Sequence, residues 1–297
     1  MTGKQKAHIA TLTANLIYGA NFSIAKIVMP EHIKPAGFIL LRVFFATILF
    51  FIMSAVTKNN TMPERKDMGR FFLLGLFGVA INQLLFFEGL SRTSNINAAL
   101  IMTTNPVLVF LFAGIIFGEI INWQRIIGIL CGLIGAGALI LMSRRHGIGN
   151  LDGDLMVFIN ATSYAIFMVM AKPMMRKYHP WIVLKWTFFF GTLMVIPFGY
   201  NQAMTVDWAS FDLTQWSAVV FVIFFTTFLA YLLNTVGLKE LSPSVVSYYI
   251  YIQPVFATII SLIIQHEPLK WVQIVSCLVI FTGVRLVTGP TLVKAKS

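Results

Sequence analysis

Hydrophobic residues gather in long blocks that short polar segments separate. Each block has about 20 residues, the length that an α-helix needs to cross a hydrocarbon core about 30 Å thick at about 1.5 Å per residue. Strands of a membrane β-barrel would instead alternate in polarity. The pattern predicts an all-α membrane protein with ten transmembrane helices, at residues 8–28, 36–57, 69–90, 94–117, 123–143, 153–174, 181–200, 215–237, 243–265 and 271–289.

The second half of this pattern repeats the first. A shift of 148 residues lays the segment 89–119 over the segment 237–267 without a gap, so that Pro106 meets Pro254 and Asn105 meets the similar Gln253. With five spans in each half, the second half begins on the opposite side of the membrane from the first. The sequence therefore predicts two inverted five-helix repeats, residues 1–145 and 146–297, an architecture that recurs in secondary transporters.

Composition agrees with a membrane protein. The chain is 58% hydrophobic and 11% charged, whereas soluble domains are about 45–50% apolar and about 25% charged. The net charge of +11 would suggest a nucleic-acid partner in a soluble protein. No basic stripe with interleaved aromatic residues is present, so we expect no nucleic-acid partner and assign the charge to loops that flank a lipid bilayer.

Lysine and arginine mark cytoplasmic loops. If both termini are cytoplasmic, that side collects most of them: Lys4, Lys6, Lys58, Arg65, Lys66, Arg70, Arg125, Lys172, Arg176, Lys177, Lys239, Lys294 and Lys296. The other side receives Lys34, Arg92, Arg144, Arg145 and Lys270. The pair Arg144-Arg145 is the one clear exception to this orientation.

Each repeat has a proline about twelve residues into its fourth span, at Pro106 and Pro254. Proline removes a helical hydrogen bond and frees carbonyl groups of the preceding turn. We expect a broken or kinked helix whose loosened backbone and adjoining Asn105 or Gln253 face a central cavity. A packing kink without ligand contact is the alternative, and the duplication favours the cavity.

Other polar residues at membrane depth are costly and tend to face a bundle interior or a water-filled space. The candidates for the cavity lining in the first, third, sixth, eighth and ninth spans are Tyr18, Asn21, Asn82, Asn160, Tyr164, Tyr231, Asn234 and Tyr251. For any one of them, a hydrogen bond between helices is an equally good interpretation.

Charged residues separate into three groups. Lys26 and Lys172 lie near span ends, where their side chains are expected to extend to the membrane interface. Arg42 and Lys185 lie further inside their spans. Glu88, near the outer end of the third span, is a further candidate site residue: it could pair with Arg42 or Lys26, bind a cationic group, carry a proton, or have no mechanistic task.

The fifth and tenth spans carry few polar groups. The fifth has Gly128, Gly132 and Ala136 at four-residue spacing, which lets another helix approach closely. These spans are interpreted as scaffold and as the candidate contact of a homodimer. Sequence motifs for phosphate binding, metal binding or nucleophilic catalysis are absent, so the sequence predicts no catalytic residue, no metal and no cofactor.

The chain resembles the EamA family of the drug/metabolite transporter superfamily. The resemblance rests on Tyr-Gly-Ala-Asn-Phe at 18–22, Arg42, Thr93-Ser94, Ala98-Ala99-Leu100, Asn105-Pro106 and Gly118-Glu119, with Ser242-Pro243, Pro254-Val255 and Glu267-Pro268 in the second half. The family commonly has tryptophan in place of Tyr18. The resemblance implies export or exchange of small metabolites such as amino acids across the cytoplasmic membrane of a bacterium.

Two other functions remain open at this point. Export of lipophilic cations, as in small multidrug transporters, is weakened because the first span contains no glutamate. A membrane enzyme that acts on a lipid-linked substrate would be favoured by histidine or acidic clusters in the loops, and the short loops lack them. The sequence does not distinguish substrates within the transporter class.

Overall fold

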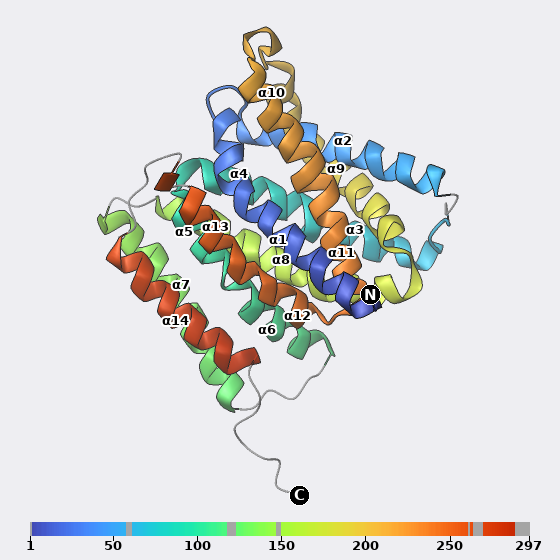
Figure 1. Cartoon of the computed structure of the whole chain (residues 1–297). Helices are drawn as coiled ribbons and strands as arrows, with labels where there is room; N and C mark the ends of the chain where they lie inside the picture. The colour runs from blue at the N-terminus through green and yellow to red at the C-terminus, as the bar shows by residue number, and fades with distance from the viewer. Residues whose placement is uncertain are drawn as a thin grey trace, which may run out of the picture.

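The structure is a computed structural model that describes residues 2–57, 61–117, 123–146, 150–260, 262–263 and 270–288. These residues form a bundle of helices, and no strand occurs among them (Figure 1). The motif residues Gly118-Glu119 and Glu267, and the predicted span ends at 265 and 289, lie outside the described residues.

The first half of the described chain contains α1 (Gly3–Val28), α2 (Pro35–Val56), η1 (Arg65–Asp67), α3 (Met68–Gly75), η2 (Leu76–Ala80), α4 (Ile81–Arg92), α5 (Asn95–Met102), α6 (Asn105–Phe117) and α7 (Trp123–His146). The second half contains α8 (Leu151–Lys177), α9 (Pro180–Met204), η3 (Trp208–Ser210), α10 (Leu213–Val220), η4 (Phe221–Leu229), α11 (Ala230–Glu240), α12 (Pro243–Tyr248), η5 (Tyr249–Tyr251), α13 (Ile252–Ile260) and α14 (Trp271–Thr288).

Six helical segments are long and apolar enough to cross a membrane: Pro35–Val56, Arg65–Arg92, Asn95–Ile116, Leu151–Lys177, Pro180–Met204 and Leu213–Glu240. The predicted class, an all-helical protein with several membrane-length helices, is therefore confirmed. The remaining helices coincide with the other four predicted spans, but the count of ten spans and their inverted repetition stay predictions.

The first helix begins at Gly3, before the predicted residue 8, because polar residues cap its start. The Thr2 hydroxyl accepts from the Gln5 backbone N–H, and the Gln5 side chain accepts from the Thr2 backbone N–H at 2.9 Å. This reciprocal capping box satisfies two of the backbone donors that a helix start leaves free. The polar flank thus extends the helix beyond its apolar block.

The predicted interruptions near the two prolines are present. In the first half α5 ends at Met102 and α6 begins at Asn105, so Pro106 occupies the first turn of a new helix, where its missing N–H costs nothing. The hydroxyls of Thr103 and Thr104 donate to the carbonyls of Leu100 and Ile101. In the second half η5 separates α12 from α13, which carries Pro254.

Two π-helical stretches, η2 and η4, interrupt the third and eighth predicted spans at equivalent places. The shift of 148 residues carries Leu76–Ala80 to positions 224–228, inside Phe221–Leu229. The pattern of apolar residues along the chain does not predict a π-turn. Such turns occur frequently at functional sites. They lie beside the cavity described below.

The packing contacts of equivalent helices in the two halves correspond. Helix α1 packs on α11 and α13, whereas α8 packs on α4 and α6, and α2 packs on α9. Helices α7 and α14 lie side by side at one edge of the bundle (Figure 1). A Cβ built on Gly283 would lie 2.6 Å from the carbonyl oxygen of Gly128 and the amide nitrogen of Gly132. The glycine stripe of the fifth predicted span therefore admits α14 of the same chain.

Helices α1 and α8 run in opposite directions. The start of α1 lies at the end of α11, where a Cβ built on Gly3 would lie 3.7 Å from Glu240 Oε2, and the end of α8 is there too, because Lys172 Nζ donates to the Leu241 carbonyl at 2.7 Å. The end of α1 and the start of α8 meet at Thr93. Its carbonyl accepts from Lys26 at 2.6 Å, and its hydroxyl donates to Asp154 at 2.5 Å.

Candidate functional site

A cavity of about 60 Å³ lies where the two halves meet, between α1, α2, α4, α5, α8, η4, α11 and α13. Its lining combines aromatic and amide side chains with one guanidinium group. The lining residues are Tyr18, Asn21, Phe22, Arg42, Asn82, Gln83, Phe86, Phe87, Met102, Asn160, Tyr164, Thr226, Tyr231 and Gln253. This volume holds a few water molecules.

Most of the predicted site residues meet at this cavity. Those that line it are Tyr18, Asn21, Asn82, Asn160, Tyr164, Tyr231 and Gln253. Asn105, Pro106, Asn234, Tyr251, Pro254 and Glu88 are not among the lining residues. The lining comes from the predicted spans that carry the candidate residues and also from the second span, which carries Arg42 and was not assigned to the cavity. The sequence did not resolve which face of each span points inward.

The predicted residues that miss the cavity have other partners. Buried Asn105 donates from Nδ2 to the Ala161 carbonyl at 2.8 Å, which joins α6 to α8. Asn234 donates to the Tyr164 hydroxyl and so supports a lining residue from behind. The ring of Tyr251 packs against Tyr248 and Phe281.

Pro106 and Pro254 are buried in the first turns of α6 and α13. Glu88 pairs with Arg92 on the same helix, four residues away. The pairing of Glu88 with Arg42 or Lys26, one of the roles the sequence allowed, is therefore not what the structure shows. Spacing of opposite charges at i and i+4 on a helix could have indicated the Arg92 partner from sequence.

Lys26 and Lys172 have defined partners at helix ends. Each donates to carbonyls at a helix C-terminus: Lys26 to Thr93, and Lys172 to Leu238 and Leu241 at 2.7 Å each. A cation at a helix C-terminus meets free carbonyls and the negative end of the helix dipole. The two lysines therefore stabilise the ends of α4 and α11.

Hydrogen bonds fix the tyrosines and amides of the cavity wall. Tyr231 accepts from Gln83 Nε2, and its hydroxyl lies 3.0 Å from Asn82 Oδ1 and 3.1 Å from the Gly78 carbonyl. Asn160 donates from Nδ2 to the Asn82 carbonyl at 2.6 Å. Gly78 belongs to η2, so the π-turn supplies one of the acceptors.

The wall also holds buried polar atoms without a hydrogen-bond partner among the described residues. They are Tyr18 Oη, Asn21 Oδ1, Asn160 Oδ1, Thr226 Oγ1 and Arg42 Nη1. Nearly all buried polar groups in proteins are paired with protein or water. Orphaned atoms that line one cavity therefore indicate a place for water or a ligand.

The sequence placed Arg42 inside a span without assigning it to the site, and it did not include Gln83 among the candidates, although both line the cavity. It missed Phe22, Phe86, Phe87 and Met102 entirely, because a phenylalanine in a cavity wall and one that faces lipid look alike in sequence. It also missed Asp154, a buried carboxylate at the start of α8 that accepts from Thr93 and Asn97.

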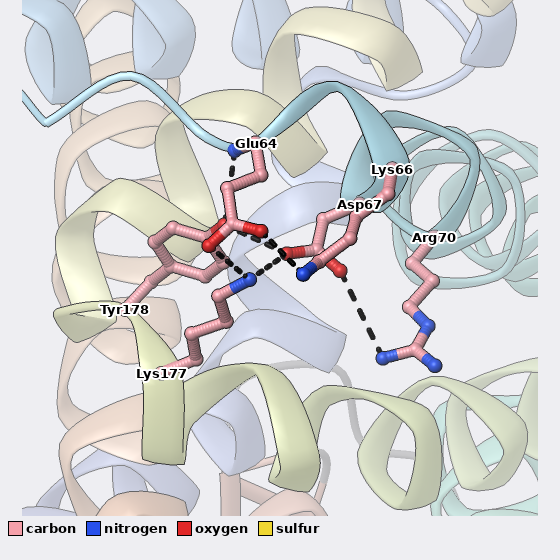
Figure 2. A network of polar contacts seen from close by, with 6 residues as sticks. All are labelled: Glu64, Lys66, Asp67, Arg70, Lys177 and Tyr178. Carbon is pink, nitrogen blue, oxygen red and sulfur yellow. Dashed lines mark hydrogen bonds and ion pairs between the residues drawn. The ribbon is translucent and has the colours of Figure 1, made fainter.

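A second polar cluster joins the segment before α3 to the end of α8. We call it the inter-half cluster; it comprises Glu64, Lys66, Asp67, Arg70, Lys177 and Tyr178 (Figure 2). Lys177 Nζ lies 2.6 Å from both Glu64 Oε1 and Asp67 Oδ2, and Tyr178 donates to Asp67 at 2.7 Å. Hydrogen bonds from Lys177 and Lys66 lower the pKa of Glu64.

No group of three or more histidine, cysteine, aspartate or glutamate side chains that could hold a metal ion occurs among the described residues. The cavity wall carries amide, hydroxyl, guanidinium and aromatic groups, which suit hydrogen bonding and stacking.

Comparison with known proteins identifies a family. A model of the EamA-like transporter family matches the chain twice, at residues 5–141 and 151–289. The uncharacterized transporter YyaM of Bacillus subtilis is 27% identical over 95% of this chain and 93% of its own length. The uncharacterized transporter YetK of the same organism is 24% identical over 94% of this chain and 85% of its length.

A relative from Archaeoglobus fulgidus, also described as an uncharacterized transporter, is 23% identical over 86% of this chain and 90% of its length. A protein of known crystal structure superposes with a TM-score of 0.66 at 16% sequence identity and covers 96% of both chains. At that identity the similarity establishes a shared fold.

Proposed function

The chain belongs to the EamA-like transporter family, and from this premise we propose that it is a secondary transporter of small metabolites such as amino acids. In this proposal it exports or exchanges its substrate across the cytoplasmic membrane of a bacterium by alternating access. The observation that carries the proposal is the cavity, which draws its lining from both halves of the chain.

Several contacts support two inverted five-helix repeats. The bond between Gln83 and Tyr231 joins residues that the shift of 148 superposes, as expected if a two-fold axis passes between them. Lys26 on Thr93 and Lys172 on Leu241 form an equivalent pair of contacts. The opposite directions of α1 and α8 agree with inversion of one repeat against the other.

The size of the cavity supports alternating access. Pockets that enclose small ligands measure about 300–1,000 Å³, whereas this cavity measures about 60 Å³. A metabolite therefore needs the two halves to move apart before it can enter. The inter-half cluster spans the halves at one face, and its ion pairs would have to break when that face opens.

We further propose that both termini lie in the cytoplasm, as the distribution of lysine and arginine favours. This orientation places the inter-half cluster at the cytoplasmic face. A cysteine at Asp207→Cys should then react with a membrane-impermeant maleimide in intact cells, and labelling only after permeabilisation would contradict the orientation. We also propose that two copies of the chain make contact through α7 or α14.

Transport in proteoliposomes tests the proposed function. Purified protein is reconstituted in vesicles loaded with the twenty common L-amino acids, and counterflow of each labelled amino acid is compared with that of protein-free vesicles. We expect time-dependent counterflow of at least one of them. Equal flux with and without protein for every amino acid would overturn the proposal for this substrate class.

A matched pair of variants links transport to the cavity. Asn21→Ala removes a lining amide, and its loss should slow counterflow about tenfold, which corresponds to about 1.4 kcal/mol. Ser217→Ala removes an exposed hydroxyl on α10 and should leave the rate unchanged. Equal rates in both variants would remove Asn21 from the proposed lining.

The alternative of a lipophilic-cation exporter is disfavoured by the charge of the cavity. The lining includes Arg42, and it includes no aspartate or glutamate among the described residues. A cationic substrate would therefore meet a like charge without a compensating carboxylate.

A further inference from the structure

Arg42 carries a buried charge without a countercharge. Its residue is 2% exposed, and no aspartate or glutamate among the described residues forms an ion pair with it. Burial of an ion costs several kcal/mol unless a partner and hydrogen bonds compensate the loss of water. An anion that enters the cavity would supply the missing countercharge.

The neighbours of Arg42 hold it in place but do not neutralise it. Its Nε donates to the Thr227 hydroxyl at 2.7 Å, and that hydroxyl lies 2.7 Å from the Val222 carbonyl. Its Cζ lies 4.3 Å from the centre of the Phe87 ring, close enough for a cation–π contact. These contacts fix the plane of the guanidinium group with neutral partners only.

The remaining face of the guanidinium group belongs to the cavity. Arg42 is one of the lining residues, and its Nη1 has no hydrogen-bond partner among the described residues. Arginine presents its N–H groups as a planar fork that matches the two oxygens of a carboxylate. A held guanidinium group with an unpaired donor in a cavity wall is the arrangement expected of a carboxylate receptor.

The same cavity offers acceptors for a second group. Asn21 Oδ1 and Asn160 Oδ1 also line it without partners among the described residues. Such oxygens accept hydrogen bonds from an ammonium or hydroxyl group. A ligand that carries a carboxylate and a nearby donor, such as an α-amino acid or an α-hydroxy acid, would satisfy both kinds of atom.

We propose that Arg42 binds the carboxylate of the transported compound and thereby selects amino acids and related carboxylic acids over amines and neutral analogues. This inference deepens the proposed function and rests on it, because only that function makes the bound carboxylate part of a transported compound. The binding of a carboxylate at Arg42 can be tested without any transport measurement.

The binding test uses acetate and its neutral isostere acetamide. The thermal unfolding of the purified full chain is followed by its intrinsic tryptophan fluorescence at constant ionic strength, with chloride as the reference anion. We expect acetate to raise the midpoint of the wild type more than acetamide does. Arg42→Gln should weaken the half-saturating effect of acetate at least tenfold, and Arg42→Lys should restore part of it.

Two controls separate binding from folding. Removal of an unpaired buried charge should leave the midpoint of Arg42→Gln without ligand unchanged or raised, because the cost of its burial disappears. Lys185→Gln removes another buried cation, which bonds to Ser54 at 3.3 Å on the α2–α9 contact and does not line the cavity. This variant should keep the wild-type response to acetate.

The outcomes are distinct. An acetate response that is absent in the wild type, or equal in Arg42→Gln, overturns the role of Arg42 whatever the flux. A response that depends on Arg42 in a protein that moves no amino acid overturns the proposed transport of amino acids and leaves carboxylate binding in place. Where counterflow is observed, the decarboxylated amine of the transported amino acid should compete at least tenfold less well than the amino acid itself.

Discussion

At the scale of single residues, the role of a polar side chain depends on which neighbour the helix face that carries it contacts. Asn21 and Asn105 are the same residue type, and both are fully within spans. Asn21 lines the cavity, whereas Asn105 donates from Nδ2 to the Ala161 carbonyl away from it. A buried amide is costly until it is paired. The Oδ1 atoms of both residues lack a partner among the described residues, but only that of Asn21 lies on a residue that lines the cavity, where a ligand can reach it.

Tyr231 offers a test of this account. Tyr231→Phe keeps the ring that packs edge-on against Phe188 at 5.1 Å, but it removes the hydroxyl that serves Gln83, Asn82 and Gly78. We expect a loss of about 1 kcal/mol of stability, since bonds between membrane helices are worth about 0.6–2 kcal/mol. Thermal unfolding in detergent measures it.

The control for this prediction is Tyr248→Phe, which removes a hydroxyl from an exposed tyrosine. Its midpoint should match the wild type. A Tyr231→Phe midpoint that is also unchanged would show that the hydroxyl network adds no stability in the resting state.

At the scale of helices, close approach at glycine fixes how the halves meet. Gly89 on α4 faces Gly153 on α8, and a Cβ built on Gly89 would lie 2.7 Å from the Gly153 carbonyl oxygen. The equivalent Gly237 on α11 lies against Thr11 of α1, at 2.0 Å between the built Cβ and the hydroxyl oxygen. Glycine is required at both places because backbone, or a side chain on the facing helix, occupies the position of a Cβ.

Gly89→Ala should therefore destabilise the protein by about 1–3 kcal/mol, the usual cost of overpacking, because the obstacle is backbone and cannot rotate away. The matched control is Gly69→Ala on α3, where a Cβ meets nothing within 4 Å. There alanine should stabilise by about 0.5–1 kcal/mol through helix propensity. Unfolding midpoints of the two variants should move in opposite directions, and a common direction would contradict the explanation.

At the scale of the whole molecule, the inter-half cluster connects the first half to the second through Lys177 and the two carboxylates of Glu64 and Asp67. Because hydrogen bonds lower the pKa of Glu64 in the folded protein, its ionised form contributes stability. This contribution is fully present above the pKa of the unfolded chain, about 4.3, and is lost as the pH falls through the lowered folded value.

Glu64→Gln should consequently lower the unfolding midpoint at pH 7. The difference between the midpoints of the variant and the wild type should become smaller as the pH falls below about 4.3. Between pH 7 and pH 5.5 the difference should stay constant. Unfolding followed across this pH series measures the effect, and Glu31→Gln, for which the structure gives no ion pair, serves as the control. A difference that grows as the pH falls would contradict the assignment.

The sequence by itself determined the helical membrane class, the duplication of the sequence pattern and the interruption before each proline. It indicated all the spans that supply the cavity except the second, which carries Arg42. These features depend on the length of apolar blocks and on local backbone chemistry, which neighbouring residues decide. The partners of buried charges do not follow from such local features. The sequence placed Arg42 inside a span, but whether a countercharge lies beside it depends on which helices pack against α2.

Only the tertiary structure decided which side chains converge. It brought Gln83 to Tyr231 across the two halves, turned Asn105 and Tyr251 away from the cavity, and directed Lys26 and Lys172 to helix ends. These outcomes follow from the rotation of each helix about its own axis, which a broad apolar pattern leaves open. The unpaired Nη1 of Arg42 in the cavity wall results from that packing, and the proposed binding of a carboxylate rests on it.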